Sequence, residues 1–248
     1  MKRRHGAAVY VPQREVELRA RVASLSRGKL PVCAVDSIYR EILSNSRAAQ
    51  GQAPLGLLRT SADSILLSAR WHFGACDEFQ TKKTWTELTT GLRAGSLTLA
   101  LLTGNDLARI LKTPVARRHF LAHFHIVGDF PSTSEKKVPL AQRILIVMPR
   151  TQGVTCAVDR MLILIECKST LNAVKKLPNS MSDRSIQAEE LPFSGQSVRS
   201  ATTALVRLIL PKRMDASQAT DRLLAAGKAN GIQISLLGVY PGTENYGG

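Results

Sequence analysis

The chain has 248 residues, of which 44% are hydrophobic and 21% are charged. This length and apolar content are enough for one to three folded domains and exclude an intrinsically disordered chain. No run approaches the roughly 20 apolar residues that span a bilayer, and the basic start at residues 1–12 lacks the apolar segment of a secretory signal. We therefore expect a cytoplasmic protein.

The formal net charge is +15, which indicates either an acidic or nucleic-acid partner or small anionic metabolites. Aromatic residues make up only 5% of the chain, and this argues against a stacking platform for single-stranded nucleic acid. The basic residues are spread along the sequence without zinc-finger spacing. The four cysteines form no Cys-x-x-Cys pair, which is typical of buried free thiols in a reducing compartment.

The first 50 residues predict a helical hairpin. Residues 12–27 read as one helix, because Pro12 suits a first turn and Gly28 suits the residue after a C-terminus. A second helix is expected from Pro31 to about Gln50, with apolar residues at helical spacing. A short linker at 51–54 then ends the hairpin.

The middle of the chain alternates strands with helices, which predicts an α/β layer with a parallel or mixed sheet. Either Asn105 or Asp106 could cap the last helix of this part. The expected strands are 54–58, 97–103, 124–130 and 143–149, and the expected helices are 61–73, 84–94 and 105–111.

The last part predicts the order β-α-β-β-α-β, which is the ferredoxin-like plan. Its expected strands are 160–166, 185–191, 203–210 and 232–240, and its expected helices are 169–176 and 215–230. The fold class is therefore mixed α+β. We expect three units, at 1–51, 55–150 and 158–243.

The hairpin carries four motifs in order: Pro-Gln-Arg-Glu at 12–15, Gly-Lys-Leu-Pro at 28–31, Ile-Tyr-Arg-Glu-Ile at 38–42, and a serine and glutamine at 46 and 50. This pattern resembles the chorismate mutase domain of the bifunctional chorismate mutase–prephenate dehydratase family. The resemblance implies a site for a dicarboxylate that rearranges through a polarised ether oxygen. The positions that match the family's active-site and supporting residues are Lys2, Arg14, Glu15, Ser46 and Gln50.

The family domain begins with a long helix that supplies essential arginines, and this sequence starts just before the position of Lys2. We therefore expect either impaired mutase activity or a gene start assigned too late. The hairpin should also expose an apolar face, which has to dock against something.

Residues 57–105 resemble the front of the family's prephenate dehydratase domain, through Leu57-Leu58, His72-Phe73-Gly74 and Asn105. Arg143 matches the arginine of a catalytic Thr-Arg-Phe, with Gln142 and Ile144 in place of its neighbours. The glycine-rich substrate loop is replaced by 59–64, and only 37 residues lie between Asn105 and Arg143, where the family has a second lobe. The resemblance thus implies a dehydratase that has lost catalysis.

Residues 234–242 resemble the closing strand of an ACT domain, the phenylalanine-sensing module of the same family. Its ligand motifs map to Leu171, Asn172, Glu189 and Glu190, with changed residue types. Either a phenylalanine effector site or a purely structural dimerisation fold is implied. His119, His123 and His125 invite a metal interpretation, but no nearby carboxylate or cysteine completes a set, so no metal or other cofactor is expected.

Two hypotheses follow. The first is a divergent chorismate mutase–prephenate dehydratase-like protein of phenylalanine biosynthesis, impaired in both reactions and acting as a regulatory or scaffolding subunit. Its partners would be chorismate- or prephenate-like dicarboxylates, a second copy in a homodimer, or a full-length relative. The second is a basic, non-catalytic module that binds an acidic protein or nucleic acid through salt-sensitive contacts.

Overall fold

The computed structural model describes residues 10–133, 138–150, 159–167, 186–192, 202–210 and 215–240. The expected helix at 169–176 lies outside these ranges, as do the candidate site residues Lys2, Leu171 and Asn172. Within the ranges, helices and a mixed sheet confirm the predicted α+β class. No helix in this described part combines the length and apolar content that a membrane span requires.

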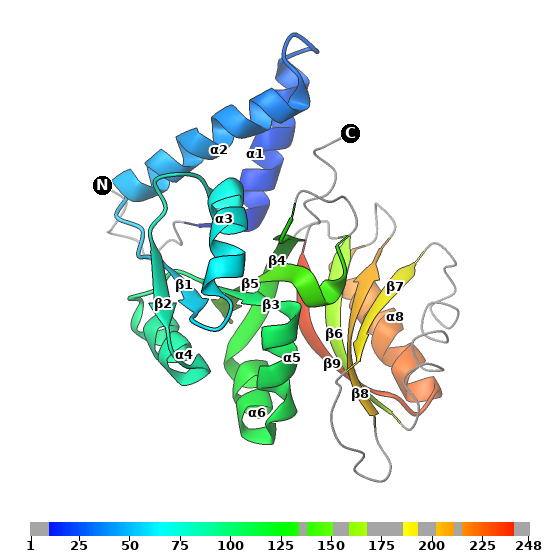
Figure 1. Cartoon of the computed structure of the whole chain (residues 1–248). Coiled ribbons are helices and arrows are strands. Elements are labelled where there is room, and N and C mark those ends of the chain that lie inside the picture. Colours follow the sequence, from blue (N-terminus) through cyan, green and yellow to red (C-terminus); the bar gives the residue numbers. More distant parts are fainter. Residues whose placement is uncertain are drawn as a thin grey trace.

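The predicted hairpin is present as α1 (Pro12–Leu25) and α2 (Val32–Ala49). Pro12 opens α1, where its missing N–H costs no hydrogen bond. Arg27 and Gly28 both have positive φ in the turn between the helices, at 49° and 75°. Figure 1 shows the hairpin projecting from one end of the molecule, with its turn pointing away from the sheet.

The middle of the chain forms a lobe around three parallel strands and two antiparallel ones. Its order is β1 (Leu55–Leu58), α3 (Ala62–Phe73), β2 (Phe79–Lys82), α4 (Trp85–Ala94), β3 (Ala100–Thr103), α5 (Gly104–Lys112), α6 (Pro114–His123), β4 (Phe124–Pro131), the 3₁₀ turn η1 (Leu140–Gln142) and β5 (Arg143–Pro149). The sequence did not predict β2 or α6. Strand β2 is a four-residue strand at the edge of the sheet. Its side chains are half-exposed or exposed, so it has no buried apolar run that the sequence could have revealed.

The cap of α5 differs from the prediction. Thr103, not Asn105 or Asp106, is the N-cap, and its hydroxyl accepts a hydrogen bond from the Asp106 N–H at 3.0 Å. The Asp106 carboxylate in turn accepts from the Thr103 N–H at 3.2 Å, which completes a capping box. Asn105 therefore lies two positions after the residue that caps the helix.

The last part contains β6 (Arg160–Cys167), β7 (Gln187–Pro192), β8 (Thr202–Ile209), α8 (Ala216–Ala229) and β9 (Gln233–Tyr240). Asp215 caps α8 by accepting hydrogen bonds from two backbone N–H groups. The antiparallel strand order β9-β6-β8-β7 is that of a ferredoxin-like sheet.

The two parts share one nine-stranded sheet in the order β2-β1-β3-β5-β4-β9-β6-β8-β7 (Figure 1). They join where β4 pairs in parallel with β9, at Ile126 and Gly238. One core cluster crosses this seam, because Leu162, Leu205 and Tyr240 belong to the same buried cluster as Phe120 and Phe124 of the lobe. The seam is therefore packed on apolar side chains as well as hydrogen-bonded.

Candidate functional site

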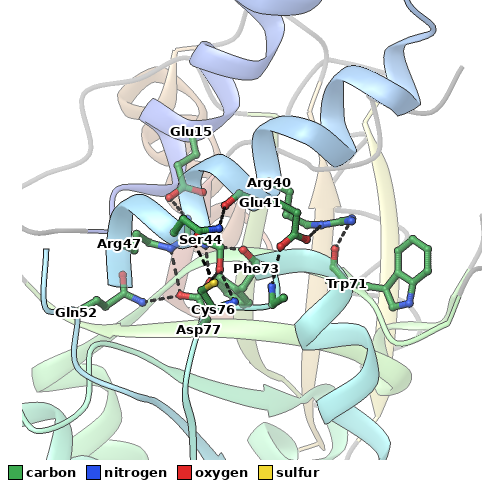
Figure 2. Close-up of polar contacts among 12 residues, drawn as sticks. Glu15, Arg40, Glu41, Ser44, Arg47, Gln52, Trp71, Phe73, Cys76 and Asp77 are labelled. Atoms are coloured by element: carbon green, nitrogen blue, oxygen red, sulfur yellow. Dashed lines mark hydrogen bonds and ion pairs between the residues drawn. The ribbon is translucent and has the colours of Figure 1, made fainter. Parts of the chain in front are cut away.

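The hairpin is fastened to the lobe by a cluster of charged side chains that we call the hairpin cluster (Figure 2). Its centre is Arg47 of α2, whose side chain is only 3% exposed. Arg47 Nη1 lies 2.5 Å from Glu15 Oε1 of α1, and Nη2 lies 2.8 Å from Asp77 Oδ2. Nη2 also donates to the Phe73 carbonyl at 2.6 Å, at the end of α3. One guanidinium thus links both hairpin helices to the lobe.

Asp77 lies in the loop before β2 and is the lobe's half of this link. Its carboxylate accepts from Ser44 Oγ at 2.7 Å and from Gln52 Nε2 at 2.9 Å, in addition to Arg47. Each of these donors is satisfied by one buried carboxylate, and hydrogen bonds to a charged group are stronger than neutral ones. The hairpin cluster is therefore a closed set of ion pairs and hydrogen bonds, with its charges paired inside the protein.

Burial affects the titration of the groups around Arg47. Desolvation raises the pKa of Glu15 above its usual value, although the positive charge of Arg47 acts in the opposite direction. Burial also raises the pKa of Tyr10, whose ring packs against Phe73 with centroids 5.4 Å apart. The chain just before α1 is thereby anchored on the lobe.

The mutase-like residues fall into two groups in the structure. Arg14, Ser46 and Gln50 are exposed, and Gln50 Nε2 donates to Ser46 Oγ at 2.9 Å on the same face of α2. Glu15 is instead turned to Arg47. The structure therefore brings Ser46 and Gln50 together, and it engages Glu15 within the protein.

A second charged group, which we call the junction cluster, lies where the lobe meets the C-terminal strands. Arg143 at the start of β5 is 1% exposed, and its Nε donates to Asp129 Oδ2 of β4. Arg207 Nη1 of β8 donates to the same oxygen at 2.7 Å. Arg207 Nε also lies 3.2 Å from Glu189 Oε2 of β7. The carboxylate of Asp129 thus accepts hydrogen bonds from one arginine in each half of the sheet.

The dehydratase-like residues lie near this cluster. Thr103 pairs with Ile144 across β3 and β5, so the first turn of α5 and the start of β5 meet at one edge of the lobe. Asn105 is exposed there, in that first turn. Arg143 is not exposed, and its guanidinium is directed to Asp129 inside the protein. The two residues occupy neighbouring elements but different environments.

The described effector candidates lie on β7. Glu189 Oε1 accepts a hydrogen bond from the Leu140 N–H of η1 at 2.5 Å, while its other oxygen faces Arg207. Glu190 is half-buried and is paired in register with Val206 of β8. Glu189 therefore connects the C-terminal strands to the turn that precedes Arg143.

One pocket, of about 220 Å³, lies beside the hairpin cluster. Its lining residues are Ala48, Gly51, Gln52, Ala53, Cys76, Asp77 and Glu78. A search of the described ranges finds no group of three or more histidine, cysteine, aspartate or glutamate residues able to hold a metal ion. His119 and His123 do face each other along α6, with ring centroids 5.0 Å apart.

The sequence did not single out Arg47, Asp77, Asp129 or Arg207. A signal existed for two of them, because Asp129 and Arg207 are lone charges inside otherwise apolar strands, "FHIVGDF" and "TALVRLIL". A charge in such a position has to be paired. Arg47 and Asp77 gave no comparable signal, since both stand among polar neighbours.

Comparison with known proteins gives two kinds of likeness. The family described as chorismate mutase type II matches residues 1–51. A sequence comparison with curated proteins finds no match. Among solved structures, one titled "GqqA- a novel type of quorum quenching acylases" is 17% identical, with a TM-score of 0.53, and the match covers 75% of this chain and 94% of that one.

Two prephenate dehydratase structures also match, at 13% identity each. The one from Streptococcus mutans has a TM-score of 0.47, and the match covers 77% of this chain and 98% of that one. The one from Staphylococcus aureus subsp. aureus Mu50 has a TM-score of 0.44, with 75% and 99% covered. At such identities a structural likeness concerns the fold alone. The sequence match to type II chorismate mutase agrees with the predicted resemblance of the hairpin, and it covers residues 1–51.

Proposed function

We propose that this chain is a chorismate mutase–prephenate dehydratase-like protein of aromatic amino acid biosynthesis that is impaired in both reactions and serves as a regulatory or scaffolding subunit. One observation carries the proposal: Arg143, which the resemblance assigns to the substrate carboxylate, is buried and paired with Asp129. A cation that already has a carboxylate inside the protein is not available to a second one.

The architecture of the lobe supports the proposal that dehydratase activity is lost. Between Asn105 and Arg143 the described residues form α5, α6, β4 and η1, which pack on or extend the lobe's own sheet. Dehydration of a charged substrate needs a cleft that excludes water and holds the reacting groups in place. The described elements in this interval belong to the lobe's sheet or pack on it. They do not form the second side of a substrate cleft.

The hairpin supports the loss of mutase activity. Arg14, Ser46 and Gln50 are exposed, and Glu15 is engaged by Arg47. Donors that stabilise charge in a transition state act strongly only when water is excluded and their positions are fixed. Exposed side chains do not meet this condition.

The placement in aromatic amino acid biosynthesis rests on the sequence match of residues 1–51 to type II chorismate mutase. A regulatory role would use the C-terminal strands, because Glu189 connects β7 to η1 and so to the start of β5. A phenylalanine effector remains part of the proposal. It would act by changing the position of β7 and hence the contacts of Glu189.

A direct assay tests the proposal. Purified full-length chain is incubated with chorismate and, separately, with prephenate, with and without phenylalanine, beside an active bifunctional enzyme as control. We expect no loss of chorismate and no phenylpyruvate above the buffer blank, and an altered rate when the chain is added to the active enzyme. Turnover of chorismate that Arg14→Ala or Lys2→Ala abolishes would overturn the loss of mutase activity. Phenylpyruvate formation would overturn the loss of dehydratase activity.

A further inference from the structure

The first helix of the hairpin carries a row of exposed apolar side chains. Val11, Leu18 and Leu25 are spaced seven residues apart, and each is between 37% and 67% exposed. Seven residues are close to two helical turns, so Leu18 and Leu25 lie in one line along α1, and Val11 is the N-cap residue just before the helix. The side chains of Glu15 and Val22, which lie to one side of this line, are half-buried.

The second helix carries a matching pair. Ile38 and Ile42 are each 51% exposed and lie one turn apart on α2. At about 100° per residue, they face away from Arg40, Ser44 and Arg47, which contact the lobe. On each helix the apolar row lies about a quarter of a turn from the side that contacts the other helix. Because the two helices are antiparallel, both rows then face the same side of the hairpin. This side is turned away from the hairpin cluster.

Together these residues form what we call the outer face of the hairpin. The turn extends the face, because two further apolar side chains there are exposed. The residues of the outer face are Val11, Leu18, Leu25, Leu30, Val32, Ile38 and Ile42. Exposed apolar side chains gathered on one side of an element often mark a site of protein–protein interaction. The hairpin lies at one end of the molecule (Figure 1), and these side chains are exposed.

Two arginines flank the outer face on α1, and the exposed Glu17 lies between them in the sequence. Arg14 and Arg21 follow the apolar row of α1 at the same spacing of seven residues, and both are exposed. Two turns of helix put them about 10 Å apart along the axis. Neither guanidinium has an ion-pair partner among the residues that the structure describes. Arg27 and Lys29 add two exposed cations at the turn.

We propose that the outer face binds an amphipathic α-helix of an acidic partner protein. The partner's apolar stripe would lie between the rows of α1 and α2, as in other complexes in which a helix occupies an apolar groove. Carboxylates two turns apart on the partner helix would pair with Arg14 and Arg21. The apolar and the cationic residues of α1 both recur every seven residues. A second helix packed along α1 presents side chains at the same spacing, and we therefore propose a helix as the partner.

A second copy of this chain is a poorer occupant. Facing copies would bring Arg14 and Arg21 of each hairpin towards those of the other, and each chain carries a net charge of +15. Like charges across an interface oppose association. The inference goes beyond the proposed function, because the outer face exists whether or not the chain turns over chorismate or prephenate.

The test uses a synthetic helical peptide of about six turns, with leucines in a heptad stripe and glutamates on the flanks. A control peptide keeps the leucines and replaces each glutamate with lysine. Binding to the full-length chain is measured by fluorescence anisotropy over a range of salt concentrations. We expect the acidic peptide to bind at least tenfold more tightly than the basic one, with an affinity that falls as salt rises.

Variants of the chain locate the binding. Ile42→Asp and Leu25→Asp should each weaken acidic-peptide binding at least tenfold. Arg14→Glu should weaken it and flatten its salt dependence. Leu224→Asp on α8 and Val115→Asp on α6 are matched controls, because these side chains are also exposed apolar residues but lie outside the face; they should bind like the wild type. Circular dichroism confirms that each variant is folded.

Three results would overturn the proposal. Equal binding of the acidic and basic peptides would remove the electrostatic argument. If Leu224→Asp weakened binding as much as Ile42→Asp, the peptide would not be bound at the outer face. Sedimentation of the wild-type chain as a dimer that Ile42→Asp converts to a monomer, with no peptide binding, would assign the outer face to a second copy.

Discussion

Arg47 and Asp77 are buried charges whose pairing depends on the hairpin being docked. We expect Asp77→Ala to lower the free energy of unfolding by about 3–5 kcal/mol, because buried Arg47 would keep Glu15 but lose Asp77, and Ser44 and Gln52 would lose their acceptor. Urea denaturation at neutral pH measures this change. Glu41→Ala is the control, since the pair of Glu41 with Arg40 is partly exposed and should be worth less than about 1 kcal/mol. Equal losses in the two variants would contradict the role of the hairpin cluster.

His72 should make the free energy of unfolding depend on pH. Its ring stacks on Phe130 with centroids 4.1 Å apart, and burial, helped by Arg19, Arg47 and Arg40, lowers its pKa to about 3. The unfolded chain takes up this proton near pH 6.5, so the folded state loses stability as the pH falls from about 6.5 towards 3. The loss is at most about 1.4 kcal/mol per pH unit.

His72→Phe keeps an aromatic ring against Phe130 and removes the proton. Urea denaturation at several pH values between 7 and 4 should therefore show a flatter decline of stability in His72→Phe than in the wild type. Parallel declines in the two proteins would show that other groups cause the acid sensitivity.

At the level of single elements, α5 depends on its cap. Thr103→Ala removes the hydroxyl that accepts from the Asp106 N–H, and we expect a loss of about 0.5–2 kcal/mol in the free energy of unfolding. Thr90→Ala is a suitable comparison, because the Thr90 hydroxyl donates only to a carbonyl within its own helix and is exposed. A loss no larger in Thr103→Ala than in Thr90→Ala would contradict the importance of the cap.

Most helices and strands were predictable from the sequence, because local signals define them. Proline at the start of α1 and the apolar spacing of α2 indicated the hairpin, and long apolar runs indicated β4, β5, β6, β8 and β9. The edge strand β2 has no such run and was missed. Helix α6 follows α5 after a single residue, so the two helices could not be separated by a loop signal.

The candidate site was less predictable than the elements. A resemblance identifies positions such as Arg143, but it does not show which residues those positions contact. Asp129 is 14 residues from Arg143 and 78 from Arg207 in the sequence, and only strand pairing brings the three together. The environment of Arg143 is therefore a property of the folded sheet.

At the scale of the whole molecule, the seam between β4 and β9 depends on Gly238. A Cβ at this position would lie 2.2 Å from the Ile126 carbonyl oxygen, which is closer than any real contact. We expect Gly238→Ala to push β9 away from β4, so that thermal unfolding measured by calorimetry splits from one transition into two. Gly95→Ala is the control, since its Cβ would meet nothing within 4 Å and only its positive φ makes the substitution costly, by about 1–2 kcal/mol. A single transition in Gly238→Ala would show that other contacts suffice to join the halves.

The shared carboxylate of Asp129 also constrains how this sequence can drift over generations. A mutation that neutralises Asp129 leaves one buried cation in the lobe and another in the C-terminal strands, Arg143 and Arg207. No single further substitution repairs both, so descendants that change one of the three positions should change the others as well. The two halves of the chain are thereby inherited as a pair, even though each is built on a fold plan of its own.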